Sequence, residues 1–447
     1  MLEVLSDRTY RHLFAAQIIA LLGTGMATVA LGLLAYDLAG PNAGAVLGTA
    51  LMIKMVAYIG VGPVVNAFID RLPRRALLVS MDLVRAAVAL LLPFVDQVWQ
   101  VYVLIFALQS ASAAFTPTFQ AAIPDILPDE KQYTRALSLS RLAYDLESLV
   151  SPMLAAALLT VISFHWLFAG TVVGFLASAA LVVSVIVPQP KATGPRGGIY
   201  DRTTRGSRIY LKTPRLRGLL ALNLVAAAAG AMVIVNTVVY VREFLGRPED
   251  DVALALAAFG GGSMIAALTL PRLLDKISDR VVMLSAGSVL LAGLLAMAAL
   301  TASPQIDHWL ALLAMWAVLG GGYSAVLTPS GRLLRRSASP EDRSALFAAQ
   351  FALSHACWLV TYGVAGRVGA AAGMTTTLLV LAVLALIGLL AAARVWPSSD
   401  PDVVEHDHPE LAPDHPHVLQ HRARAAHAHE FVIDDLHRRW PERSAHT

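Results

Sequence analysis

Long runs of apolar residues, separated by short stretches rich in charge, proline or glycine, are the dominant pattern of this 447-residue chain. A helix needs about 20 mostly apolar residues to cross the hydrocarbon core of a membrane, and twelve runs of that length predict membrane-spanning helices. The first six cover residues 12–39, 45–69, 76–95, 98–123, 137–162 and 166–187. The second six cover residues 217–241, 252–274, 281–302, 308–333, 345–371 and 375–396. The pattern therefore predicts an all-α integral membrane protein.

Composition agrees with this interpretation and excludes a soluble chain. Hydrophobic residues make up 57% of the sequence and charged residues 15%, and the mean hydropathy is +0.63, whereas soluble domains carry about 25% charged residues. The single cysteine, Cys357, excludes a disulfide scaffold within one chain. The formal net charge of +3 comes from basic residues spread between the apolar runs, so no basic surface for nucleic acid is expected.

The basic residues also predict how the chain is oriented, because Lys and Arg accumulate in cytoplasmic loops. Basic residues precede the first apolar run and follow the second and the fourth. Eight Lys and Arg residues lie between residues 191 and 217. The intervening loops are nearly free of them. We therefore expect both termini in the cytoplasm and a multi-pass protein of the cytoplasmic (inner) membrane.

The chain is internally duplicated. Ala-Phe-Thr-Pro at residues 114–117 is echoed at 325–329, and the Asp-Arg loop at 70–75 is echoed at 275–280. The predicted organisation is a six-helix half (1–190), a basic cytoplasmic linker (191–216), a second six-helix half (217–396) and a soluble tail (397–447). Two related halves around a site near the middle of the membrane are typical of secondary transporters.

Ionisable residues inside the predicted spans are candidates for transport or coupling, because a charge in the hydrocarbon core is costly unless it is paired or faces a cavity. They are Lys54, Arg141, Asp145, Glu147 and His355. Arg141 and Asp145 are four residues apart and predict a neutralising pair. Glu147 then remains as the unpaired carboxylate near the middle of its span, and we expect Lys54 to have its partner on another span.

His355 occupies the depth in the second half that corresponds to Glu147 in the first. A carboxylate and an imidazole there are suited to exchanging protons or to binding a divalent metal. The structural alternative is that Glu147 belongs to a hydrogen-bond network and that His355 is a satisfied core histidine. Asp82 and Arg85, three residues apart, are expected to form a structural ion pair.

The last 42 residues contain nine of the 13 histidines of the chain. The imidazoles and the acidic residues between them suit nickel, zinc, copper or cobalt, and the alternative is a solvated tail that binds metal only incidentally. A short amphipathic helix is expected at residues 430–440. The candidate metal ligands are His406, His408, His415, His417, His421, His427 and His429.

Three stretches resemble one family. Residues 66–75 resemble a loop of the form Gly-x-x-x-Asp-Arg-x-Gly-Arg-Arg, with Asn66 and Pro73 in place of the glycines; residues 77–93 and 114–128 resemble its third and fourth spans. Ser151 replaces the glycine of a Gly-Pro-x-Leu-Ala motif. These stretches are similar to the major facilitator superfamily, within it to the branch with siderophore and macrolide exporters, over about residues 6–396.

The resemblance implies a twelve-helix transporter whose loops between the second and third span of each half act in gating. The residues concerned are Asp70, Arg71, Arg74, Arg75, Asp275 and Lys276. Nickel-resistance permeases of the same branch end in a histidine-rich cytoplasmic tail, as this chain does.

We therefore expect a proton-coupled exporter of nickel or a related divalent metal. A drug, macrolide or siderophore exporter is the first alternative, and a non-transporting membrane metal sensor is the second. The expected partners are the substrate, protons and the lipid bilayer. With no catalytic triad, Walker loop or dinucleotide motif in the sequence, neither enzymatic activity nor a cofactor is expected.

Overall fold

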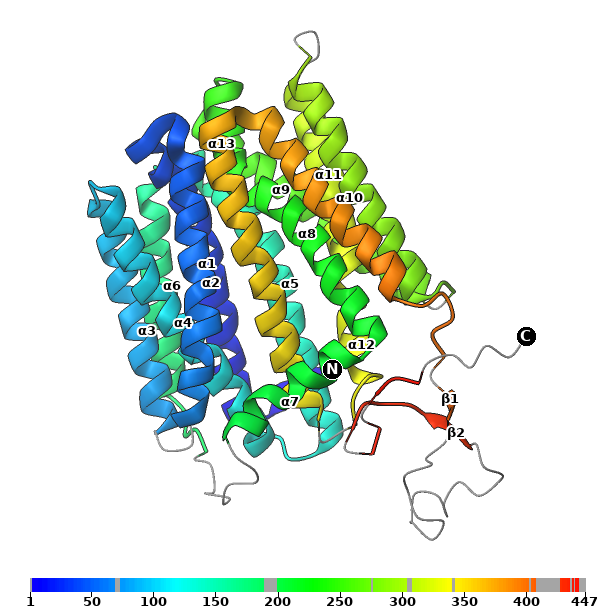
Figure 1. Ribbon diagram of the computed structural model, residues 1–447. Coiled ribbons are helices and arrows are strands. Elements are labelled where there is room, and N and C mark those ends of the chain that lie inside the picture. The colour runs from blue at the N-terminus through cyan, green and yellow to red at the C-terminus, as the bar shows by residue number, and fades with distance from the viewer. Residues whose placement is uncertain are drawn as a thin grey trace.

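The computed structural model describes residues 2–68, 73–188, 199–274, 276–303, 308–339, 342–401, 403–406, 427–434, 436, 437 and 439–441. Long helices run side by side in one bundle (Figure 1). The first half contains α1 (Arg8–Ala39), α2 (Ala43–Phe68), α3 (Arg74–Leu91), α4 (Val98–Ile126), α5 (Glu130–Leu159) and α6 (His165–Val183). Short 3-10 turns lie at η1 (Leu2–Ser6), η2 (Gly40–Asn42) and η4 (Leu92–Phe94).

The second half contains α8 (Pro214–Val239), the π-helical turn η5 (Tyr240–Phe244), α9 (Glu249–Leu274), α10 (Asp279–Thr301), α11 (His308–Leu327), α12 (Ser330–Arg335) and α13 (Arg343–Val395). Helix α13 reverses direction at Gly373, where φ is 79° and ψ is 175°. Glycine tolerates this backbone because it has no Cβ. The chain rises along the first part of α13 and descends along the second (Figure 1).

Among the residues described, nine segments are long and apolar enough to cross a membrane. Two of these segments, Arg8–Val61 and Ala345–Val395, each contain a reversal of the chain, at η2 and at Gly373. The expected all-α membrane fold is confirmed. The count of twelve spans and the cytoplasmic position of the termini stay predictions.

Small residues allow the helices to approach closely. A Cβ added to Gly262 would lie 1.8 Å from the carbonyl oxygen of Ala317, and one added to Gly320 would lie 1.8 Å from that of Phe259. Helices α9 and α11 therefore pack backbone against backbone, as glycine-rich helices in membranes do. The two halves meet where α2 packs against α13 and α5 against α9.

Part of the segment expected to be a linker is helical. Helix α7 (Ile199–Lys212) lies across one end of the bundle (Figure 1). Arg205 donates two hydrogen bonds to Asp342, at 2.6 and 3.1 Å, and the Tyr210 hydroxyl donates to Gln350 Oε1 at 2.5 Å. These bonds fasten the connection between the halves to the first turns of α13.

The tail carries a short antiparallel β-ribbon of β1 (Val403–His406) and β2 (His427–Glu430), with Val403 opposite Glu430 and His406 opposite His427. The expected amphipathic helix at 430–440 is wrong, since β2 occupies its start and no helix covers the rest among the described residues. Asp434 Oδ1 accepts hydrogen bonds from the backbone N–H groups of Leu436, at 2.8 Å, and His437, at 2.6 Å. A local turn of this kind competes with helix formation.

The segment after β2 packs against the second half of the bundle. Phe431 and Ile433 are 3% and 4% exposed and belong to the main apolar core of the bundle. The guanidinium of Arg215, at the start of α8, lies 5.1 Å from the ring centroid of Trp440. Arg215 is itself paired with Asp400 at 3.4 Å. The segment after β2 is therefore docked on the bundle, which composition alone did not indicate.

Candidate functional site

Three of the five intramembrane candidates come together where the halves meet. Lys54 lies on α2, Glu147 on α5 and His355 on the first part of α13. The charge of Lys54 acts on both Glu147 and His355. All three side chains are partly exposed although they lie well inside their helices. An acid, an amine and an imidazole from three helices thus share one polar region.

Aromatic rings border this region. The Tyr58 ring stands edge-on to His355 and to Phe351, with centroid separations of 5.2 and 5.8 Å, and Lys54 Nζ lies 5.6 Å from its centroid. His355 Nδ1 lies 2.6 Å from the carbonyl oxygen of Phe351. That nitrogen must therefore carry the proton, which leaves Nε2 of the neutral ring as an acceptor.

The aromatic surface continues along the second half. The ring centroid of Trp358 lies 4.9 Å from that of Tyr362 and 6.1 Å from that of Tyr323. The centroids of Tyr323 and Phe259 are 5.5 Å apart. These aromatic residues were not among the candidates predicted from the sequence. A signal was present: positions 351, 355, 358 and 362 recur at intervals of four, three and four, which places their side chains on one helix face.

Glu147 is positioned by close contact between α1 and α5. A Cβ added to Gly25 would lie 2.2 Å from Ser151 Oγ and 2.9 Å from Glu147 Oε1. Ser151 is fully buried, and its hydroxyl has no hydrogen-bond partner among the described residues. The serine that replaces a family glycine thus fills the space that Gly25 leaves open.

Asp82 and Arg85 form a buried ion pair on α3. Ser178 donates a hydrogen bond to Asp82 at 2.7 Å, and the guanidinium of Arg85 lies 4.2 Å from the Phe115 ring and 4.6 Å from the Phe175 ring. The pair therefore joins α3 to α4 and α6. This arrangement matches a structural role.

The expected gating residues are placed only in part. Arg74 is buried and pairs with Asp125 at the end of α4, and Arg75 donates to the carbonyl oxygen of Val183. Lys276 is exposed. Asp70, Arg71 and Asp275 lie outside the described residues, as do the side chains of Arg141 and Asp145.

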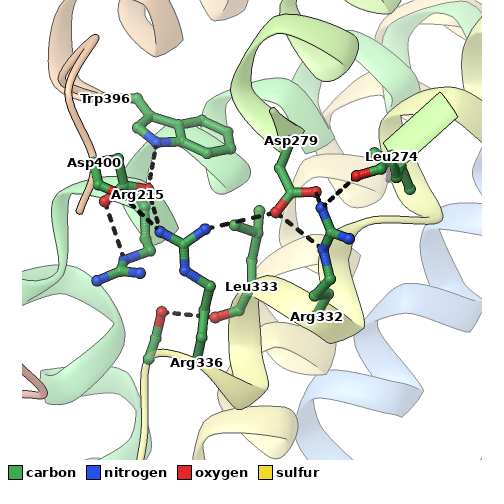
Figure 2. A network of polar contacts seen from close by, with 9 residues as sticks. Arg215, Leu274, Asp279, Arg332, Leu333, Arg336, Trp396 and Asp400 are labelled. Atoms are coloured by element: carbon green, nitrogen blue, oxygen red, sulfur yellow. Dashed lines mark hydrogen bonds and ion pairs between the residues drawn. The ribbon is translucent and has the colours of Figure 1, made fainter. Parts of the chain in front are cut away.

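A charged cluster that the sequence did not predict lies at the corresponding end of the second half, as Figure 2 shows. Asp279, at the start of α10, accepts from Arg332 and pairs with Arg336 at 3.6 Å. Arg336 also donates to Asp400 at 3.0 Å, and Asp400 accepts from the Trp396 indole at 3.1 Å. The internal repeat could have indicated this cluster, because Asp279 lies 205 positions after Arg74 and so occupies the corresponding place in the second half.

The metal-binding hypothesis concerns residues that the structure describes little. The side chains of His406, His427 and His429 lie outside the description, and His408, His415, His417 and His421 lie outside it entirely. Elsewhere, the described part of the chain contains no group of three or more His, Cys, Asp or Glu residues able to hold a metal ion.

Two helical halves with ionisable side chains at their junction define a secondary transporter rather than an enzyme. The chain belongs to the Major Facilitator Superfamily, whose family model matches residues 13–244 and 219–426. The fold agrees: a mutant of the nucleoside transporter NupG superimposes with a TM-score of 0.69 at 14% identity, covering 87% of this chain and all of that one. A POT family transporter in complex with 5-aminolevulinic acid gives a TM-score of 0.67 at 11% identity, covering 88% and 96%.

Two relatives are similar in sequence over part of their length. An uncharacterized MFS-type transporter of Bacillus subtilis (strain 168), YfiS, is 24% identical over 251 residues, which cover 54% of this chain and 58% of that one. Macrolide efflux protein A of Streptococcus pyogenes is 28% identical over 149 residues, covering 32% of this chain and 36% of that one. The chain thus matches between a third and three fifths of the length of these relatives.

Proposed function

We propose that the chain exports amphipathic organic compounds from the cytoplasm in exchange for protons. The observation that carries this proposal is the chemistry of the central region. The Tyr58 ring lies beside Lys54, Phe351 and His355, and the aromatic face of α13 continues from Phe351 to Trp358. Aromatic faces bind flat apolar groups and cations. One acid and one amine give such a ligand two polar contacts.

Glu147 is the proposed proton carrier. Ionised, it balances the charge of Lys54; protonated, it is neutral and leaves Lys54 without that balance. Binding of a proton and binding of a cationic or polar substrate group therefore oppose each other at one carboxylate. Competition of this kind exchanges one against the other when the site faces alternate sides.

A macrolide efflux protein among the relatives supports both the direction of transport and an organic substrate. The nickel hypothesis has less support in the membrane-spanning part, because the described residues there offer no three-ligand group for a metal. The proposed partners are accordingly the organic substrate, protons and the lipid bilayer of the cytoplasmic membrane.

The proposal is tested by transport in everted membrane vesicles energised with a pH gradient, using a macrolide and an aromatic organic cation as probes. We expect Glu147→Gln to abolish transport driven by the pH gradient while the protein still inserts. Glu249→Gln, which changes a partly exposed carboxylate at the start of α9, is the matched control. Wild-type vesicles that transport neither probe, or a Glu147→Gln variant with unchanged flux, would contradict the proposal.

Export of a divalent metal is the second candidate, and the register of the tail ribbon favours it. His406 lies directly opposite His427, so two of the seven histidines proposed as metal ligands lie at the base of the segment between the strands. Neutral imidazoles are good ligands for nickel and zinc. Vesicle uptake of Ni²⁺ that falls when the seven histidines become glutamine, with Phe431 and Trp440 retained, would favour this candidate.

Trp358→Ala separates the two candidates at the central region. Loss of this ring removes apolar and cation-binding surface, so we expect transport of the organic probes to need a severalfold higher concentration for half-maximal rate. Ni²⁺ transport should not respond to the same change, because an indole is not a metal ligand.

A further inference from the structure

One end of the bundle is closed by contacts between the two halves. The turn η2, which joins α1 to α2, packs against α8 and α13 of the second half. Close by, the Tyr36 hydroxyl donates a hydrogen bond of 3.1 Å to Glu243 Oε2, and the guanidinium of Arg242 lies 5.2 Å from the centroid of the Tyr36 ring. One side chain of the first half thus meets two consecutive side chains of the second.

Those two side chains belong to the π-helical turn η5. The N–H of Leu245 donates to the carbonyl oxygen of Tyr240 at 3.0 Å, and the turn is followed by Gly246 at a φ of 63°. Turns of this type are rare in helices and are frequent at functional sites. The irregular turn ends the helix where Arg242 and Glu243 meet α1.

The second half holds Arg242 in place from behind. Arg242 Nη1 donates to the carbonyl oxygen of Arg247 at 3.1 Å, and Arg247 Nε donates to Asp251 at 2.7 Å. The guanidinium of Arg247 also lies 4.2 Å from the Trp309 ring. This network joins the ends of α8, α9 and α11 within one half. Tyr36 contacts it from the other half.

A seam of small residues lies deeper between the halves. A Cβ added to Gly44 would lie 2.8 Å from Asn236 Oδ1, and one added to Gly48 would lie 2.7 Å from the carbonyl oxygen of Tyr362. Asn236 is 1% exposed and donates to the carbonyl oxygen of Ala365 at 3.2 Å. The backbones here are too close for any ligand to pass.

We propose that Tyr36, Arg242 and Glu243 form the latch of a gate at the η2 end of the transport pathway, with the seam at Gly44 and Gly48 as its seal. Transport by two halves requires this end to open in each cycle. Separation breaks the Tyr36–Glu243 bond and leaves the Arg242–Arg247 network intact. Glu243 is exposed, so water can replace its lost partner and the latch is readily reversible.

The latch is independent of which substrate is carried, because it rests on the contacts between the halves alone. The test uses the full chain in lipid nanodiscs, with Cys357→Ala as background and nitroxide labels at the exposed positions Asn42 and Ala302. Electron double resonance measures the distance between the labels, and hence the ratio of closed to open molecules. Gly48→Ala, which places a methyl group against the backbone carbonyl oxygen of Tyr362, provides the distance of the open reference.

We expect Tyr36→Phe to shift the closed-to-open ratio about fivefold toward open, as the loss of one hydrogen bond does. Tyr36→Ala, which also removes the ring under Arg242, should shift it further. Glu243→Ala should match Tyr36→Phe, and the double variant should add little, because both changes remove the same bond.

Matched controls are Tyr102→Phe, on α4, and Glu249→Gln, on α9, which should leave the distance distribution unchanged. The latch would be refuted by an unchanged distribution in both Tyr36 variants, by equal widening in the Tyr102 control, or by fully additive effects of the Tyr36 and Glu243 changes.

Discussion

The docked segment after β2 provides a quantitative test of how this part of the tail is held. Phe431 is 3% exposed, belongs to the main apolar core of the bundle and contacts Trp440 with a centroid separation of 5.1 Å. Replacing Phe431 with alanine removes the most deeply buried aromatic ring of the segment after β2. We predict that this single change releases the segment without unfolding the helical bundle.

The size of the effect follows from the buried ring. Full burial of a phenylalanine side chain is worth about 1.5–3 kcal/mol. Because the segment can detach, the bundle need not retain a cavity, so the cavity penalty of an enclosed core site should not be added. At about 1.4 kcal/mol per factor of ten, the fraction of detached segments should rise by about 10- to 150-fold.

Hydrogen exchange of the backbone amides after β2 measures this fraction directly, since local opening governs exchange. Leu436→Ala is the matched control, because Leu436 lies in the same segment but is 38% exposed; its exchange should change little. Equal protection in Phe431→Ala and wild type would refute docking through this ring. Loss of protection throughout α8 and α13 would show instead that the bundle had been destabilised.

Two further predictions concern single sites. Gly25→Ala should destabilise the bundle by about 1–3 kcal/mol, because the added methyl group overpacks against Ser151. Adding Ser151→Gly to this variant should restore thermal stability. A Gly25→Ala variant as stable as wild type would contradict the close approach of α1 and α5. Burial raises the pKa of Asp434, but hydrogen bonds and the charge from His437 outweigh it and lower the pKa to about 2. Because the pKa of an aspartate in the unfolded chain is about 3.9, the turn should be fully held above about pH 4 and should loosen as the pH falls through about 2. Faster cleavage of the tail by pepsin would report this loosening. Asp434→Asn should remove the pH dependence.

Much of the architecture was accessible from the sequence because a membrane imposes strict local requirements. Each span must be a continuous apolar run, so its existence can be read without knowing its neighbours. The break between the last two predicted spans coincides with the reversal at Gly373. The cost of a buried charge likewise made Lys54, Glu147 and His355 candidates before any contact between them was known.

The sequence alone also predicted which residues are candidates for coupling, but it did not determine that they meet. Lys54, Glu147 and His355 lie on three helices separated by more than ninety positions at each step. Only the packing of α2 and α5 against helices of the second half brings them into one region. The same packing decides that Tyr36 faces Glu243, 207 residues away.

The tail shows the limit of local patterns most clearly. Its spacing of apolar residues suggested a helix, yet the Asp434 side chain captures two backbone N–H groups and β2 pairs with a strand more than twenty residues earlier. Phe431 and Trp440 then bury their rings against the bundle rather than along one face of a helix. Composition determines which side chains are buried. The tertiary structure decides against which surface they pack, because burial depends on contacts between segments that are remote in sequence.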